Sequence, residues 1–118
     1  MVEVTTEDTV REQEAMYVRQ FGYTIRPGHE AQAATLCVRF VDMLRRRGVR
    51  AHVLVGGERD ATLQLAEEYP SLEALRVARR ALECDENYRS AASAWAAAFY
   101  PLVQASVPAM LLRDSQAA

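Results

Sequence analysis

His52 is the side chain in this sequence best suited to proton transfer. It lies in the run AHVLVGG, and Gln64 and Glu68 follow in the run ATLQLAEEY. If these two runs pair as a hairpin, alternation along each strand brings all three side chains to one face. A histidine with a carboxylate neighbour can act as a general base or orient a substrate. We therefore predict His52 as the catalytic residue and Glu68 as a ligand contact, the alternative being a hydrogen-bonded histidine at a protein interface.

Three aromatic residues, Tyr23, Tyr88 and Trp95, form a second candidate group. Trp95 lies in the alanine-rich run SAASAWAAAF, where small side chains leave either room for a ligand or close helix packing. The hydroxyls of Tyr23 and Tyr88 could donate hydrogen bonds to a phenol or carbonyl, and Arg26 or Arg19 could hold an anionic substituent. We predict Tyr23, Arg26, Tyr88 and Trp95 as ligand contacts.

Other chemistries are disfavoured by the residues that the chain lacks. It has no Lys, which excludes Schiff-base chemistry through a lysine of this chain. Its two histidines form no i, i+4 pair, and Cys37 and Cys84 have no metal or redox spacing, so we predict neither a metal nor a cofactor. Both cysteines are expected to be free thiols in a reducing cytoplasm, with a disulfide as the alternative.

Composition and charge bound the class of protein. The 118 residues, 50% of them hydrophobic, suit one domain, expected at 15–114 after a flexible arm at 1–14 and before a loose tail at 115–118. The net charge of -2 offers no basic footprint for nucleic acid. No apolar run approaches the roughly 20 residues that span a bilayer, and the acidic start is unlike a secretory signal. We expect a cytoplasmic protein with no nucleic-acid or membrane partner.

The periodicity of the apolar residues predicts strands and helices in the order βαββαβ. Alternating or β-branched runs predict strands, and apolar residues every three or four positions predict helices. The predicted strands are 15–26, 50–56, 61–69 and 103–112, and the predicted helical regions are 29–47 and from 72 to before Pro101, with a break around 84–87. This order predicts an α+β, ferredoxin-like fold, with a four-stranded antiparallel sheet and both helices on one face.

The first helix is predicted to end in the run Arg45-Arg46-Arg47, just before Gly48. Cations in a last turn complement the helix dipole. We interpret the run as a solvated helix end, with an anion or phosphate site as the alternative.

Strand parity predicts two unequal sheet faces. The odd positions are apolar or aromatic and suit packing beneath the helices; they are Phe21, Tyr23, Ile25, Val53, Val55, Leu63, Leu65, Val107 and Leu111. The even positions mix polar side chains such as Ser106 with Leu54, Ala66, Met110 and Leu112, which would be costly to leave wet. Two such sheets packed around a twofold axis would cover this face, so we predict a homodimer, with a monomer as the alternative. Pro108 should lie at an edge position or a bulge.

Several short motifs resemble the dimeric α+β barrel superfamily over nearly the whole chain after residue 15. They are Tyr17-Val18-Arg19, Pro27-Gly28-His29-Glu30, Gly56-Gly57, the second-helix entry Glu68-Tyr69-Pro70-Ser71-Leu72-Glu73 and the break that follows at Leu82-Glu83-Cys84-Asp85-Glu86-Asn87-Tyr88. In these motifs the chain is similar to antibiotic-biosynthesis monooxygenases, EthD-like proteins and, in its short link after the first helix, NIPSNAP-like domains.

The resemblance implies a dimeric α+β barrel and a range of activities. Members range from cofactor-free oxygenation of aromatic polyketides through haem degradation to isomerisation and ligand binding, so the fold leaves the chemistry open. Haem is disfavoured here because the second helical region has no histidine. We expect a cofactor-independent oxygenase, isomerase or cyclase acting on a small aromatic or polyketide-like metabolite. The alternative is a non-catalytic small-ligand-binding or protein-interaction module with the same dimeric fold.

Overall fold

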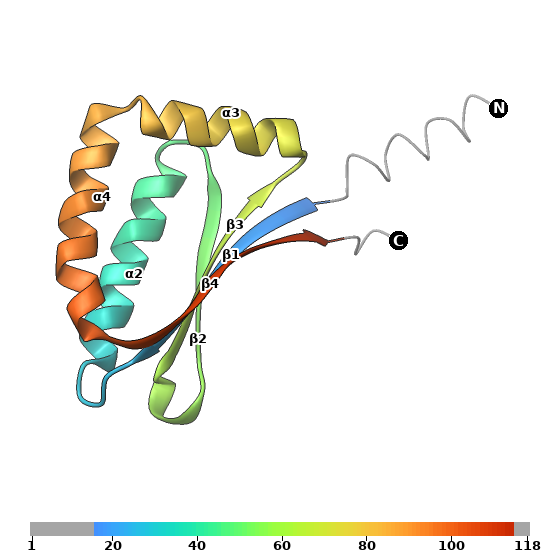
Figure 1. Cartoon of the computed structure of the whole chain (residues 1–118). Helices are drawn as coiled ribbons and strands as arrows, with labels where there is room; N and C mark the ends of the chain where they lie inside the picture. The colour runs from blue at the N-terminus through green and yellow to red at the C-terminus, as the bar shows by residue number, and fades with distance from the viewer. Residues whose placement is uncertain (1–15, 115–118) are drawn as a thin grey trace.

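The computed structural model describes residues 16–114, which form four strands and three α-helices (Figure 1). In chain order they are β1 (Met16–Ile25), α2 (Glu30–Arg45), β2 (Arg50–Gly56), β3 (Thr62–Tyr69), α3 (Leu72–Glu83), α4 (Glu86–Phe99) and β4 (Val103–Asp114). Short 3-10 turns, Glu58–Asp60 and Tyr100–Leu102, precede β3 and β4. The arm predicted at 1–14 and the tail predicted at 115–118 lie outside the described residues.

The four strands form one antiparallel sheet in the spatial order β2-β3-β1-β4. β2 and β3 make the predicted hairpin, and β1 lies in the interior of the sheet between β3 and β4. Figure 1 shows α2 and α4 side by side on one face of the sheet, with α3 crossing near one end of it. This arrangement confirms the predicted ferredoxin-like fold.

The second helical region divides where the sequence predicted a break, because two capping side chains start two separate helices. The Ser71 hydroxyl accepts a hydrogen bond from the Ala74 amide at 3.0 Å and begins α3. The Asp85 carboxylate accepts from the Tyr88 amide at 3.0 Å and begins α4. This hydrogen bond, together with the Arg47 guanidinium, lowers the pKa of Asp85.

The core lies between the helices and one face of the sheet. The predicted odd positions of β1 and β3 supply Tyr23, Ile25, Leu63 and Leu65, all buried, and Phe21 and Val53 pack against them. Helix α2 contributes a buried stripe of Ala33, Cys37, Val41 and Leu44, and α4 contributes Phe99. Burial of this apolar face is the main favourable term in folding. Parity therefore predicts the helix-facing side correctly for the three strands that precede β4. The predicted packing was wrong for Val55, which is 48% exposed near the end of β2 although it pairs with the buried Leu63.

In β4 the prediction was wrong for Val107 and Ser106, because a bulge reverses parity there. Gln20 pairs with Met110 and Gly22 with Val107, so two steps along β1 match three along β4. Pro108 lies inside this bulge, on an edge strand, because it has no amide to donate to the ladder. Val107 thus lies opposite Gly22 on the face away from the helices, 56% exposed, and Ser106 lies opposite Tyr23 on the helix side.

The sheet face away from the helices is apolar over β4 and at one place on β2. Leu54 (54%), Val107 (56%), Met110 (46%) and Leu112 (41%) are exposed there in the described protomer. Their cross-strand partners Gln64, Gly22, Gln20 and Val18 show that all four lie on the same face. We call these four residues the outer apolar patch. Large exposed apolar patches of this kind are typical of interaction surfaces.

Candidate functional site

His52 and Glu68 lie together on the outer face of the β2–β3 hairpin, as the sequence predicted. His52 is directly opposite Ala66, so Gln64 and Glu68 are its two diagonal neighbours on β3. Of the two, Glu68 makes the contact: its Oε2 lies 3.3 Å from His52 Nδ1. The two side chains are 37% and 24% exposed, so they form a partly shielded pair that solutes can still reach.

This pair lies in a hollow of about 470 Å³ beside the edge strand β2. The hollow is lined by Arg45, Gly48, Val49, Arg50, Ala51, His52 and Glu68. Arg45 Nε donates to the carbonyl of Ala51 at 2.7 Å, which fixes the guanidinium at the rim. The volume falls within the range of small-molecule sites, and two arginines beside it favour an anionic group.

Glu68 Oε2 lies within ion-pair distance of His52 Nδ1, which leaves Nε2 as the ring nitrogen farther from the carboxylate. An imidazole can take a proton through that nitrogen, and a neighbouring carboxylate can orient the ring. The structure therefore places a candidate general base beside a candidate positioning group.

Tyr23 and Trp95 lie on the opposite side of the sheet from His52, packed among aromatic rings. Trp95 stacks between Phe40 and Phe99, with centroids 4.4 and 4.5 Å away, and its Nε1 donates to the Leu36 carbonyl at 2.7 Å. The structure thus has the close-packed arrangement at Trp95 rather than an open wall, and Trp95 lines neither the hollow at His52 nor the groove between α2 and α4 described below.

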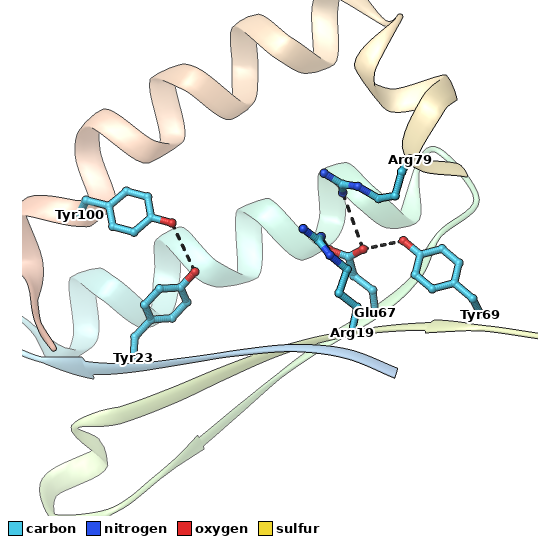
Figure 2. A network of polar contacts seen from close by, with 6 residues as sticks. All are labelled: Arg19, Tyr23, Glu67, Tyr69, Arg79 and Tyr100. Carbon is cyan, nitrogen blue, oxygen red and sulfur yellow. Dashed lines mark hydrogen bonds and ion pairs between the residues drawn. The ribbon is translucent and has the colours of Figure 1, made fainter. Parts of the chain in front are cut away.

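The hydroxyl of Tyr23 meets that of Tyr100 at 3.4 Å (Figure 2). Burial, followed by the hydrogen bond with Tyr100, raises the pKa of Tyr23 well above its ordinary range. Tyr23 is 6% exposed, so its phenol stays protonated and serves as a hydrogen-bonding group rather than a base.

Tyr88 and Arg26 lie apart from both of these places. Tyr88 is buried, with the Arg47 guanidinium 5.5 Å from its ring centroid. Arg26 is exposed after β1, where its Nε donates to the Pro101 carbonyl at 3.2 Å. The six predicted site residues therefore do not form one constellation. His52 contacts Glu68, whereas Tyr23 and Trp95 share a packed aromatic cluster through Phe99 and Tyr100 on the other side of the sheet.

Sequence reasoning missed a buried polar cluster centred on Glu67, which is 2% exposed. Figure 2 shows Arg19, Tyr69 and Arg79 converging on its carboxylate from β1, β3 and α3. Arg19 Nη1 lies 3.1 Å from Oε2, Arg79 Nη1 lies 3.8 Å from Oε1, and the Tyr69 hydroxyl donates to Oε1. The signal was available, because an acid at an odd position of β3 falls on the core side, where an ionised group requires partners.

Both cysteines are free thiols, as predicted: Cys37 is buried and Cys84 exposed. Burial raises the pKa of the Cys37 thiol to about 12. Residues 16–114 hold no group of three or more His, Cys, Asp or Glu side chains arranged to bind a metal ion. None of the helices in this range is both long and apolar enough to cross a bilayer.

No protein-family model matches the chain, and no curated protein sequence matches it. Solved structures do. A NIPSNAP family protein from Agrobacterium tumefaciens is 18% identical, with a TM-score of 0.59 over 84% of this chain and 85% of that one. SnoaB, a cofactor-independent oxygenase from Streptomyces nogalater, is 17% identical with a TM-score of 0.59 over 82% and 90%. An uncharacterised NIPSNAP-like domain protein from Burkholderia xenovorans is 17% identical with a TM-score of 0.60 over 82% and 83%.

These likenesses confirm the predicted resemblance at the level of the fold. The chain has the α+β, ferredoxin-like fold of these three structures, two of them NIPSNAP or NIPSNAP-like proteins and one a cofactor-independent oxygenase. Identities this low do not carry an activity from one protein to another.

Proposed function

We propose that the chain is a cofactor-independent enzyme that acts by proton transfer on a small aromatic or polyketide-like metabolite. The contact of 3.3 Å between His52 Nδ1 and Glu68 Oε2, at the edge of a hollow with two arginines, is the observation that carries the proposal. The cofactor-independent oxygenase SnoaB has the same fold, so the proposed reaction class is compatible with this architecture.

In the proposed mechanism an anionic oxygen of the substrate binds near Arg45 and Arg50. His52 Nε2 removes a proton from an acidic C–H or O–H group, and the electron pair of that bond remains on the substrate as an enolate or phenolate. Glu68 stabilises the imidazolium, which later returns the proton. Isomerisation and cyclisation need nothing further, whereas an oxygenase would require dioxygen as the oxidant of the carbanion.

We propose that the active form is a homodimer in which a second copy covers the outer apolar patch. The patch shares its face with His52 and Glu68, so the partner would also shield the base from water. Lower water access strengthens electrostatic effects at a site. The free thiol of the exposed Cys84 supports a cytoplasmic location.

A non-catalytic small-ligand-binding or protein-interaction module is the second candidate function. The packing of Trp95 between Phe40 and Phe99 favours it, because these rings fill the space where an aromatic substrate was expected. Under this proposal His52 would be a hydrogen-bonded residue of the dimer interface.

Hydrogen–deuterium exchange tests the proposed base without requiring the natural substrate. The wild-type protein should accelerate exchange of the acidic C–H protons of a hydroxylated anthrone in D2O, followed by NMR. His52→Gln should lower the catalysed rate by about 100-fold or more, since general-base catalysis typically contributes 100- to 10,000-fold. His29→Gln is the matched control, because His29 is exposed and its side chain makes no capping bond.

Full activity of His52→Gln would show that His52 is not the base. Saturable binding of the anthrone without acceleration by the wild-type protein would favour the second candidate.

A further inference from the structure

A second concave site lies between α2 and α4, separate from the hollow at His52. It is a groove of about 450 Å³ lined by Arg39, Asp42, Met43, Arg46, Arg47, Asn87 and Ala91. Its lining holds three arginines and one aspartate, and Asp85, just outside the lining, pairs with Arg47. Arg39 and Arg46 therefore give the groove a small excess of positive charge.

Arg47 is fixed in this groove by three contacts. Its Nε donates to Asp85 Oδ2 at 3.0 Å, its Nη1 donates to the Met43 carbonyl at 3.1 Å, and its guanidinium lies 5.5 Å from the Tyr88 ring centroid. These contacts commit part of the guanidinium to the fold and hold the remainder in place. A pre-positioned cation loses little side-chain entropy when it meets a ligand.

Arg39 lies on α2 and Arg46 is the residue that caps its C-terminal end, two turns later; both are exposed. Within residues 16–114 neither forms an ion pair or hydrogen bond with another described side chain, and Asp42, between them on the helix, is likewise unpaired there. The seven-residue spacing puts their Cα atoms about 10 Å apart along the helix axis. An arginine side chain is long enough for both guanidinium groups to reach one oxyanion bound between these positions.

The rest of the lining is suited to the uncharged, apolar part of a ligand whose anionic group binds the arginines. Met43 and Ala91 supply apolar surface from α2 and α4, and the Asn87 side chain supplies donor and acceptor groups. Asp42 would repel a ligand that is anionic throughout. The groove therefore favours a single anionic group on an apolar frame over a polyanion.

We propose that the α2–α4 groove binds a small phosphate monoester, with Arg39 and Arg46 on the phosphate and Met43 and Ala91 against its apolar part. This assigns a function to the basic helix end beyond its contribution to the helix dipole. The site is independent of the proposed reaction at His52, since the two linings share no residue.

Titration with phenyl phosphate, followed by NMR of the backbone and arginine side-chain amides, tests the proposal. Inorganic phosphate and phenol are titrated as controls, because each carries only one of the two parts of phenyl phosphate, the anion or the aromatic ring. Phenyl phosphate should bind saturably at moderate salt, at least fivefold more tightly than inorganic phosphate, with shift changes concentrated at the groove. Equal affinity for phosphate alone, or changes spread over all arginines, would overturn the proposal.

A double variant inside the groove and a matched double variant outside it sharpen the test. Arg39→Ala with Arg46→Ala should weaken phenyl phosphate binding by tenfold or more. Arg76→Ala with Arg80→Ala removes the same charge from exposed positions on α3, outside the groove, and should change it less than twofold. Equal losses in both double variants would reduce the effect to general charge attraction and refute the site.

A third variant, Ala91→Leu, tests the apolar part of the site without changing any charge. Ala91 is exposed on α4 and leucine is a good helix former, so the fold should be kept while the groove is filled. Binding of phenyl phosphate should fall at least fivefold, and unchanged binding would refute the proposed position of the apolar part.

Discussion

Arg19 and Glu67 lie directly opposite each other on β1 and β3, and their side chains meet at 3.1 Å on the helix-facing side of the sheet. The Arg19 guanidinium also lies 4.4 Å from the centroid of the Phe21 ring. Arg79 approaches the same carboxylate from α3. Glu67 thus links β1, β3 and α3 through polar contacts. These contacts matter for α3 because Leu82 is its one buried residue.

Replacement of Glu67 should destabilise the protein strongly. Glu67→Ala leaves Arg19, Tyr69 and Arg79 without their shared acceptor, and loss of one partner of a buried ion pair typically costs about 3–5 kcal/mol. Because both arginines are 26% exposed, we expect the lower end, about 3 kcal/mol, from urea unfolding followed by circular dichroism.

Glu68→Ala is the matched control for this prediction. It removes the same group from the next residue, on the opposite face, where the pair with His52 is partly exposed and should contribute about 1 kcal/mol or less. Similar losses in the two variants would show that the Glu67 cluster does not hold α3 to the sheet.

The two cysteines should differ in reactivity and in their effect on stability at high pH. Cys84 is exposed and Cys37 is buried with a pKa of about 12, against an ordinary 9.0. A thiol reagent at pH 8 should therefore label one cysteine per native chain and two in denaturant. Rapid labelling of two cysteines in the native protein would contradict the burial of Cys37, and Cys84→Ser should abolish the native reaction.

The raised pKa of Cys37 also predicts a loss of stability in alkali. The folded state holds this proton more tightly than the unfolded chain, so the stabilising contribution is complete below pH 9 and is lost as the pH rises toward 12. Tyr23 acts in the same direction, because its pKa is also raised. The free energy of unfolding should fall over this range, and the fall should be smaller in Cys37→Ala; an equal fall would exclude this linkage.

Local patterns predicted the fold well because the spacing of core residues is regular in each element before β4. It alternates along the strands and repeats every three or four residues along the helices. The hairpin register brought His52 to Glu68, since both lie within a stretch whose turn fixes the pairing. In β4 the extra residue at Pro108 reversed the alternation, and nothing in the hydrophobic pattern marks which side of the proline keeps its register.

The predicted aromatic site depended on contacts that no local pattern contains. Trp95 is held by a carbonyl at Leu36, 59 positions earlier, and by the ring of Phe40. Spacing on α4 indicates that Trp95 faces the core but not whether a cavity or another ring meets it there. The partners of Glu67 come from β1, β3 and α3, so no single stretch of the sequence contains its cluster.

Trp95 should behave as a packing residue rather than as a ligand contact. Trp95→Ala removes two stacked ring contacts and a partly buried hydrogen bond, so we expect a loss of about 3 kcal/mol in urea unfolding. Trp95→Phe keeps an aromatic ring and should cost about 1 kcal/mol, largely the lost bond to Leu36. The native tryptophan fluorescence should not change when an aromatic ligand is added, and saturable quenching would instead indicate a cavity beside the indole.

The outer apolar patch should determine whether two copies associate. Leu54 and Leu112 lie on opposite edge strands of one face and are 54% and 41% exposed in the described protomer. If a second sheet covers them, Leu54→Asp with Leu112→Asp buries two unpaired charges per copy, which costs several kcal/mol and separates the dimer. Light scattering should then give a mass of 13.2 kDa for the variant and twice that for the wild type.

Val38 and Val77 supply the control for this last prediction, because they are 48% and 58% exposed but lie on α2 and α3, away from the patch. Val38→Asp with Val77→Asp should leave the mass of the wild type unchanged. A wild-type mass of one chain at micromolar concentration would refute the proposed dimer. A dimer that survives the Leu54 and Leu112 substitutions would show that another surface joins the copies, and the Glu68–His52 pair would then remain open to water.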